Sequence, residues 1–191
     1  MAVAPIDIAN AALAKLGAEL LTSLSEDNDR AVLFNALYER VRDATLEAFP
    51  WPFAVKRTTL AQSASTPTFD WAHAYPLPPD CLKVERTDDD DSPWTVETID
   101  GTEMLFSDRA TMKIKYIFKV ADTAKFSPTY AESLIEHMAS EMALGITGKG
   151  DLKKLHYELY MGKIKEARTR ASQQKSPEVV GPDDLITHRF S

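Results

Sequence analysis

Apolar residues recur at steps of three and four along the first fifty positions, which is the pattern of two amphipathic helices. The stripe of the first helix is Ile6, Ala9, Leu13, Leu16 and Leu20. Gly17 is expected to end or bend this helix near its last turn. The stripe of the second helix is Leu33, Leu37, Val41, Ala44 and Ala48. Ser25 and Asp27 are its candidate N-caps, and Pro50 is expected to stop it.

Helical spacing returns after Ser127, which can cap a helix, and Pro128, which suits the first helical position. The stripe of this third helix is Tyr130, Leu134, Met138 and Met142, and the methionines are expected to fill core space. Gly148 and Gly150 then break the pattern. A fourth helix is expected to follow and to fade near Gln174, with the stripe Leu152, Leu155, Leu159 and Ile164.

Between these helical segments the period changes to that of strands. Met112, Ile114 and Tyr116 alternate with Lys113 and Lys115 in a β-rich run, which predicts a half-buried strand. Residues 94–99 and 103–107 flank Asp100-Gly101 and predict a hairpin. Residues 58–60 and 81–86 supply further short strands. We therefore expect a small, mostly antiparallel sheet.

The helical and β patterns meet at Phe49, Pro50, Trp51, Pro52 and Phe53. Proline lacks the N–H donor and pushes the residue before it into extended geometry, so a helix cannot continue through this segment. We interpret it as a rigid aromatic corner that fixes the angle between two modules. A second proline-rich stretch, from Tyr75 to Leu82, is expected to run extended into a strand.

Helices from both ends of the chain thus bracket the strands. This order predicts an α+β fold, a discontinuous four-helix bundle with an inserted β domain. Residues 1–54 and 123–175 are expected to form the two halves of the bundle, and residues 55–122 the β domain. Residues 176–191 show no period and are expected to form an extended C-terminal arm that folds on contact with a partner.

Composition is that of an ordinary soluble protein, with 44% hydrophobic and 27% charged residues in 191. We expect no membrane span, since no apolar run approaches the roughly 18 residues required. We also expect no signal peptide, because the N-terminus lacks a basic start and a long apolar stretch. The single cysteine, Cys81, excludes an internal disulfide and a multi-cysteine metal site. These features favour assembly in a reducing cytoplasm.

Charge is distributed unevenly. Residues 1–148 carry 13 Lys and Arg against 23 Asp and Glu, a net of −10, whereas residues 149–175 carry eight against three, a net of +5. An acidic body argues against general affinity for nucleic acid, which depends on neutralising phosphates. We interpret the basic fourth helix as a solvated face or as a contact with an acidic neighbouring subunit.

Asp88-Asp89-Asp90-Asp91 is the densest group of candidate ligands. It lacks the glycine and distal glutamate of an EF-hand-like calcium loop, so a solvated loop between strands is the favoured interpretation. Acidic side chains that line a channel and keep DNA from sticking are the other interpretation.

Catalytic signatures are absent from the sequence. The zinc-protease order His-Glu-x-x-His, the nucleophile elbow and the phosphate-binding glycine loop do not occur. His137 and Glu141 are expected to form a surface pair, and Cys81 to be a small buried hydrophobe. A pair of carboxylates for glycoside cleavage stays open, because acidic residues are numerous. We expect no cofactor and no metal.

The order of elements and the two proline-rich stretches resemble the tail tubular protein A family, the head-to-tail adaptors of short-tailed bacteriophages. The resemblance is carried by Ala11–Gly17, Ser23-Leu24, Ala31, Tyr38, Pro50-Trp51-Phe53-Ala54, Tyr75–Leu82, Tyr130-Ala131 and Leu134. The ending Asp184 to Arg189 is similar to a degraded form of the family's tail ending, with Leu185 where an aromatic residue is commoner.

This resemblance implies a virion structural protein and not an enzyme. Such adaptors form a ring, typically of twelve subunits, below the portal protein; the ring extends the DNA channel and docks a further tail component such as a nozzle. DNA would pass through the lumen without specific binding. Contact with the portal is expected from the arm, through Asp184, Leu185, Ile186, His188, Arg189 and Phe190. The alternatives are a tail-associated cell-wall hydrolase and a head-completion protein of a long-tailed phage.

Overall fold

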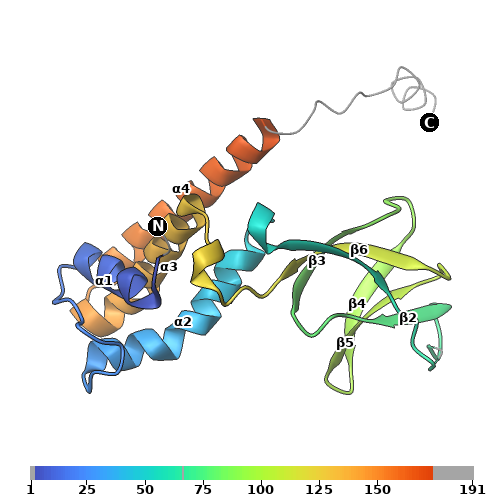
Figure 1. The fold of residues 1–191 in the computed structure, drawn as a ribbon, viewed down its shortest axis with the longest axis horizontal. Helices are drawn as coiled ribbons and strands as arrows, with labels where there is room; N and C mark the ends of the chain where they lie inside the picture. The colour runs from blue at the N-terminus through green and yellow to red at the C-terminus, as the bar shows by residue number, and fades with distance from the viewer. Residues whose placement is uncertain (1–2, 66, 174–191) are drawn as a thin grey trace.

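The computed structural model describes residues 3–65 and 67–173. These residues form four α-helices and two antiparallel sheets of three strands each. The helices gather on one side of the molecule and the strands on the other (Figure 1). The predicted mixture of helices and antiparallel strands is confirmed, although the strands form two small sheets where one was expected.

The helical part is built around α3 (Pro128–Thr147), which packs against α1 (Pro5–Lys15), α2 (Asp29–Glu47) and α4 (Gly150–Gln173). The predicted α3 stripe is confirmed, since Tyr130, Leu134, Met138 and Met142 are all fully buried. The start of α3 is also as predicted: the Ser127 hydroxyl accepts from the Tyr130 N–H, and Pro128 occupies the first turn. Gly148, with φ +67°, ends the helix in the left-handed region.

Two helix boundaries differ from the prediction. Helix α1 ends at Lys15, so Leu20 lies beyond it and is 56% exposed. The chain turns at Gly17, whose φ of +69° suits glycine. Helix α2 is capped by Asn28, not by Ser25 or Asp27, because the Asn28 side chain accepts from the Ala31 N–H.

Two predicted stripes are also wrong in part. On α2 the buried residues are Ala31, Phe34, Val41, Arg42, Thr45 and Leu46, while the predicted Ala44 is exposed. On α4 the buried residues are His156, Tyr160, Ile164 and Ala167, while the predicted Leu155 and Leu159 are exposed. In both helices polar or aromatic side chains occupy part of the face that packs on α3. In both helices, apolar periodicity alone therefore predicts a face next to the one that is buried.

The first sheet has the order β1–β6–β3, formed by Val55–Leu60, Met112–Phe118 and Cys81–Thr87. The second has the order β2–β5–β4, formed by His73–Pro76, Thr102–Ser107 and Trp94–Ile99. The predicted alternation in β6 is confirmed, with Met112, Ile114 and Tyr116 buried. The predicted hairpin is β4–β5, which turns at Asp100 and Gly101, both with positive φ.

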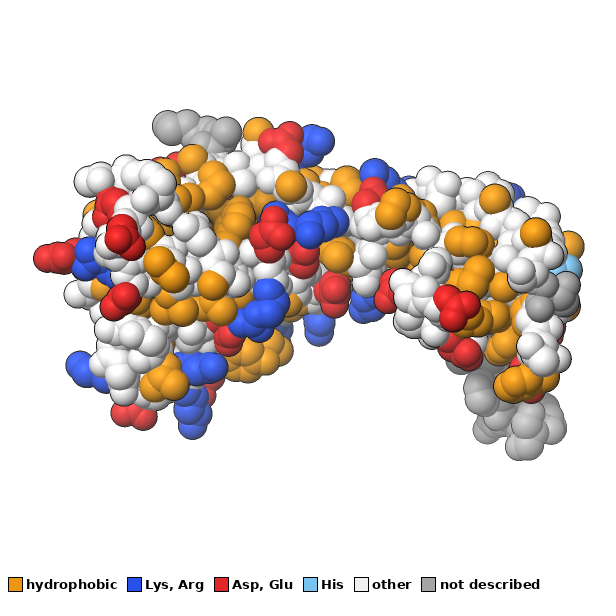
Figure 2. Space-filling view, turned by 90° about the horizontal axis from the view of Figure 1, so that it is seen from below, with side chains coloured by type: hydrophobic (Ala, Val, Ile, Leu, Met, Phe, Trp, Pro, Cys, Tyr) orange, Lys and Arg blue, Asp and Glu red, His pale blue; other side chains and the backbone are white. Residues whose placement is uncertain are grey.

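Hydrophobic side chains form two clusters. The larger fills the helical part and includes Ile117 at the end of β6 and Trp51 and Val120 from the segments that connect helices and strands. The smaller lies between the sheets, around Tyr75, Leu105 and Ile114. Phe118 packs at the edge of both clusters. Seen from below, the molecule is an arch with the helical part at one end and the β part at the other (Figure 2).

Candidate functional site at the aromatic corner

The chain crosses twice between the helices and the strands, and both crossings lie at the predicted corner. The first crossing follows α2, which stops at Glu47, and runs through Phe49–Phe53 into β1. Trp51 is extended, with φ −57° and ψ 130°, as expected for a residue that precedes proline. The second crossing leaves β6 and reaches α3 at Tyr130. The corner is therefore a joint made of two chain segments.

Five aromatic rings hold the two crossings together. Trp51 packs edge to face against Phe49 and Tyr130, with ring centroids 4.9 and 5.2 Å apart. Tyr130 also contacts Phe53 and Phe126, at 5.2 and 4.6 Å. Edge-to-face pairs of this kind stabilise a protein by about 0.5–1.5 kcal/mol each beyond the area that they bury. The cluster joins residues about 80 positions apart in the sequence.

Two buried hydrogen bonds fix the cluster on the last turns of α2. The Trp51 indole N–H donates to the Thr45 carbonyl at 3.0 Å, and the Tyr130 hydroxyl donates to the Arg42 carbonyl at 3.0 Å. Burial raises the pKa of Tyr130. Both aromatic donors of the corner, the Trp51 indole N–H and the Tyr130 hydroxyl, thus have a hydrogen-bond acceptor, and their rings are closely packed.

Charged side chains reinforce the joint at its surface. Lys119, just after β6, pairs with Asp43 of α2 at 3.2 Å. The second proline-rich stretch contributes Asp80, whose carboxylate accepts from the Lys56 ammonium at 2.6 Å and whose carbonyl accepts from the Lys119 N–H at 2.8 Å. The Lys56 ammonium also lies 3.9 Å from the centroid of the Phe118 ring. Both proline-rich stretches thus contribute to one joint.

A cleft of about 750 Å³ opens beside the corner, between the first sheet and the last turns of α4. Among the described residues, its charged lining consists of Arg57, Lys115, Arg168 and Arg170 against the carboxylate of Glu85. Arg168 donates to the Ala48 carbonyl at 3.2 Å, and Arg170 pairs with Glu166 at 2.5 Å. The excess of positive charge suits the cleft to an anionic group such as a carboxylate.

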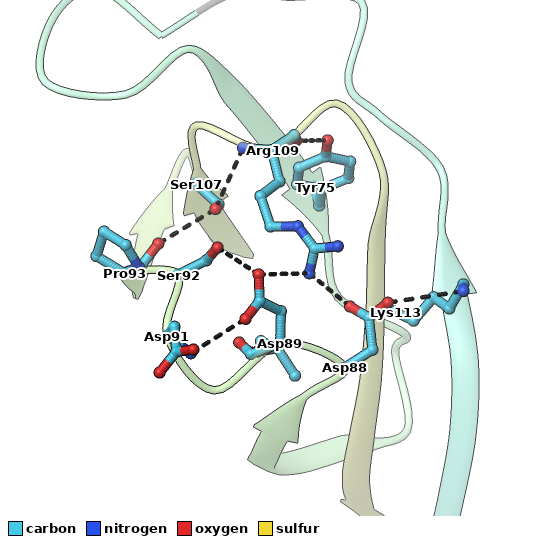
Figure 3. Close-up of polar contacts among 10 residues, drawn as sticks. Tyr75, Asp88, Asp89, Asp91, Ser92, Pro93, Ser107, Arg109 and Lys113 are labelled. Atoms are coloured by element: carbon cyan, nitrogen blue, oxygen red, sulfur yellow. Dashed lines mark hydrogen bonds and ion pairs between the residues drawn. The ribbon is translucent and has the colours of Figure 1, made fainter. Parts of the chain in front are cut away.

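The acidic run lies in the loop between β3 and β4, as predicted, but two of its members are paired. Arg109 contacts both Asp88, at 2.8 Å, and Asp89, at 3.8 Å (Figure 3). Partial burial favours a higher pKa for Asp88, but Arg109 outweighs it and lowers the pKa. The Ser92 hydroxyl and the Asp91 N–H lower the pKa of Asp89. The loop is thus held in shape by internal contacts.

The predicted apolar stripes did not include a buried polar cluster in the helical part. Glu136 on α3 is 4% exposed and contacts Lys15 of α1 and His156 of α4, each at 2.8 Å. Burial favours a higher pKa for Glu136, but these two partners outweigh it and lower the pKa. The cluster ties three helices together. Its only trace in the sequence is the spacing of His156, Tyr160 and Ile164 along one face.

His137 and Glu141 do not form the predicted surface pair. The His137 ring stacks on Tyr160 at 4.3 Å, and its Nδ1 lies 2.9 Å from the Thr45 hydroxyl. Burial lowers the pKa of His137. Glu141 instead pairs with Arg40 at 2.6 Å and with Lys153 at 3.5 Å. Both side chains contact residues of neighbouring helices instead of each other, and spacing along one helix cannot predict such contacts.

Cys81 is half-buried at the start of β3, where burial and nearby carboxylates raise its pKa to about 11. The thiol is therefore protonated at neutral pH and is a poor nucleophile. The predicted portal-binding residues Asp184, Leu185, Ile186, His188, Arg189 and Phe190 lie outside the described residues. Across residues 3–65 and 67–173, no cluster of three His, Cys, Asp or Glu side chains is placed to hold a metal ion.

Within the same ranges, none of the helices combines the length and the apolar character needed to cross a bilayer. Searches with the sequence find no matching family model and no matching curated protein. The resemblance described above therefore stays a prediction, carried by the quoted residues.

Proposed function

We propose that this protein is a head-to-tail adaptor of a phage virion. Copies of the chain assemble into a ring, of twelve subunits in the family that it resembles, below the portal protein at the junction of head and tail. The ring extends the DNA channel and offers a platform to the next tail component. Assembly takes place in the host cytoplasm, and the adaptor catalyses no reaction.

The observation that carries this proposal is the double joint at the aromatic corner. Trp51, Ala54, Asp80 and Tyr130 all belong to the residues that resemble the adaptor family, and they lie in or beside this joint. A subunit that contacts a portal at one end and a tail component at the other must transmit load between the two ends. A joint with two crossings and shared aromatic packing suits that task.

We further propose that the helices on either side of the strands form a discontinuous four-helix bundle and that the strands form an inserted β domain. Residues 176–191 form the arm that contacts the portal. The cleft beside the corner lies where α4 leads toward that arm, since Ala171 and Ser172 line it.

Co-assembly with the cognate portal protein tests the proposal. The full chain mixed with portal is expected to give a stoichiometric ring complex in native mass spectrometry. Deletion of residues 176–191 is expected to weaken that complex while leaving the thermal unfolding of the isolated chain unchanged. The matched control is replacement of the exposed hairpin turn, Asp100-Gly101, with a short linker, which should leave portal binding intact.

The two alternatives stay predictions. Release of peptidoglycan fragments by the purified protein, abolished by one carboxylate substitution, would favour the hydrolase. Binding to a head that carries a long tail would favour the head-completion protein.

A further inference from the structure

Helix α4 carries more apolar surface than its neighbours in the chain cover. Its buried stripe, which includes His156 and Tyr160, faces α3. Helix geometry places Tyr157 and Met161 on one flank of this stripe and Leu155 and Leu159 on the other. All four of these side chains are between 44% and 49% exposed. A helix that packs only within its own subunit rarely exposes so many large apolar side chains, so this surface indicates a further partner.

The flank with Tyr157 and Met161 continues into positive charge. Residues 154, 157, 161, 165 and 168 follow one another at steps of three and four, so they share one face of α4. Lys165 and Arg168 occupy the C-terminal end of this face. Within the described residues, the Lys165 ammonium forms no ion pair. The flank is therefore apolar in its middle and cationic at both ends, with Lys154 before Tyr157 and with Lys165 and Arg168 after Met161.

Helix α2 offers a face with the opposite character. Residues 32, 36, 39, 43 and 47 also share one face, with exposed Val32 and Ala36 first and the acidic residues after them. The Glu39 carboxylate is 73% exposed and lies 4.0 Å from its nearest cation, Lys119. Burial and the neighbouring Asp43 raise the pKa of Glu47, so this end of the face favours an additional cation.

The two faces match in size, charge and direction. A parallel register that sets Tyr157 beside Val32 also sets Met161 beside Ala36 and Arg168 beside Asp43, and it brings Lys165 to the level of residue 40, one residue from Glu39. The large side chains of α4 would then pack against the small side chains of α2, as in ridge-into-groove packing. Helices α2 and α4 run in the same general direction, with α2 at the lower edge of the helical part and α4 at its upper side (Figure 1). The lower face mixes apolar with charged side chains (Figure 2).

We propose that the Tyr157–Met161–Lys165 flank of α4 binds the Val32–Ala36–Glu39 face of a second copy of this chain. The inference rests on the proposed function, because a closed ring of identical subunits requires two unlike, complementary faces on each subunit. Copies related by the small rotation of a large ring keep α4 of one subunit nearly parallel to α2 of the next. The contact therefore repeats around the ring without a change of register.

Sedimentation velocity of the full chain at low salt, over a wide range of protein concentration, tests this contact. The chain is expected to self-associate, and Met161→Glu is expected to weaken association by at least about tenfold, because it places a charge at the apolar centre of the contact. Leu155→Glu is the matched control: the side chain is equally exposed on the same helix but lies on the opposite flank, so association should be unchanged.

Charge reversal gives a second test, which does not depend on whether the fold tolerates a glutamate at position 161. Lys165→Glu and Glu39→Lys are each expected to weaken association by about two- to fivefold, and the double variant is expected to recover it. Equal effects of Met161→Glu and Leu155→Glu, a double variant no better than the single ones, or a chain that stays monomeric throughout would each overturn the contact. None of these results bears on whether the chain binds its portal, which the co-assembly experiment measures separately.

Discussion

Trp51 combines packing and hydrogen bonding in one buried side chain. It contacts Phe49 and Tyr130, and its indole N–H satisfies the carbonyl of Thr45. The flanking prolines predicted the turn and the exclusion of a helix. They could not predict Tyr130 as a partner, because that contact joins segments far apart in the sequence.

Trp51→Ala is expected to lower the free energy of unfolding by about 3–5 kcal/mol, because it leaves a large cavity and an unpaired buried carbonyl. Urea denaturation followed by circular dichroism measures this loss. Phe69→Ala is the control, since Phe69 is 75% exposed, and its effect should stay within about 0.5 kcal/mol. Similar losses in the two variants would contradict a structural role for the corner.

Glu136 and His137 both contribute to the way in which stability depends on pH. The pKa of Glu136 is lowered in the fold, so its contribution is present above the unfolded value of 4.5 and is lost as the pH falls through the folded pKa. The pKa of His137 is also lowered, so the unfolded chain binds a proton more readily below 6.5. Both groups therefore make the protein more stable as pH rises through the acid range.

Glu136→Gln is expected to flatten the pH dependence of the free energy of unfolding below pH 4.5, the unfolded value, and to cost about 1–3 kcal/mol at neutral pH. Denaturant titrations at a series of pH values measure both effects. Glu166→Gln, which removes a carboxylate from the exposed pair with Arg170, should leave the acid slope as it is. An unchanged slope in Glu136→Gln would show that the buried cluster does not couple to folding.

Among the elements, both α3 and α4 form where they were predicted, but the buried face is predicted correctly for α3 and only in part for α4, and the reason lies in what each helix buries. The core face of α3 includes apolar residues at regular steps, so periodicity identifies it. The core face of α4 includes His156 and Tyr160, which are accommodated by Glu136 and His137 of α3. Such pairing depends on the neighbouring helix and leaves no apolar signal, so Leu155 and Leu159 misled the prediction.

Two glycines, Gly148 at the end of α3 and Gly162 inside α4, test the assignment of the helix end. Gly148 has φ +67°, so Gly148→Ala is expected to cost about 1 kcal/mol through backbone strain. Gly162 lies inside α4 with open space where a Cβ would stand, so Gly162→Ala is expected to stabilise the protein by about 0.5–1 kcal/mol. Thermal unfolding of both variants measures the difference, and the same sign in both would contradict the assignment of the helix end.

At the scale of the whole molecule, the order of helices and strands followed from the change of period along the chain. The division of the strands into two sheets did not. Short strands carry a weak pattern, and the pairing of β2 with β5 and of β3 with β6 depends on contacts that are distant in sequence. The face of α2 that carries Val32 and Glu39 suggests a contact between subunits only when its size and charge are compared with those of α4.

The mass of the complex between the full chain and its cognate portal, measured by native mass spectrometry, tests the proposed adaptor function most directly. We expect a complex in which the copies of this chain form a closed ring in fixed ratio to the portal. The resemblance to the adaptor family implies twelve copies in that ring. Portal and chain that remain separate at every salt concentration would contradict the adaptor function.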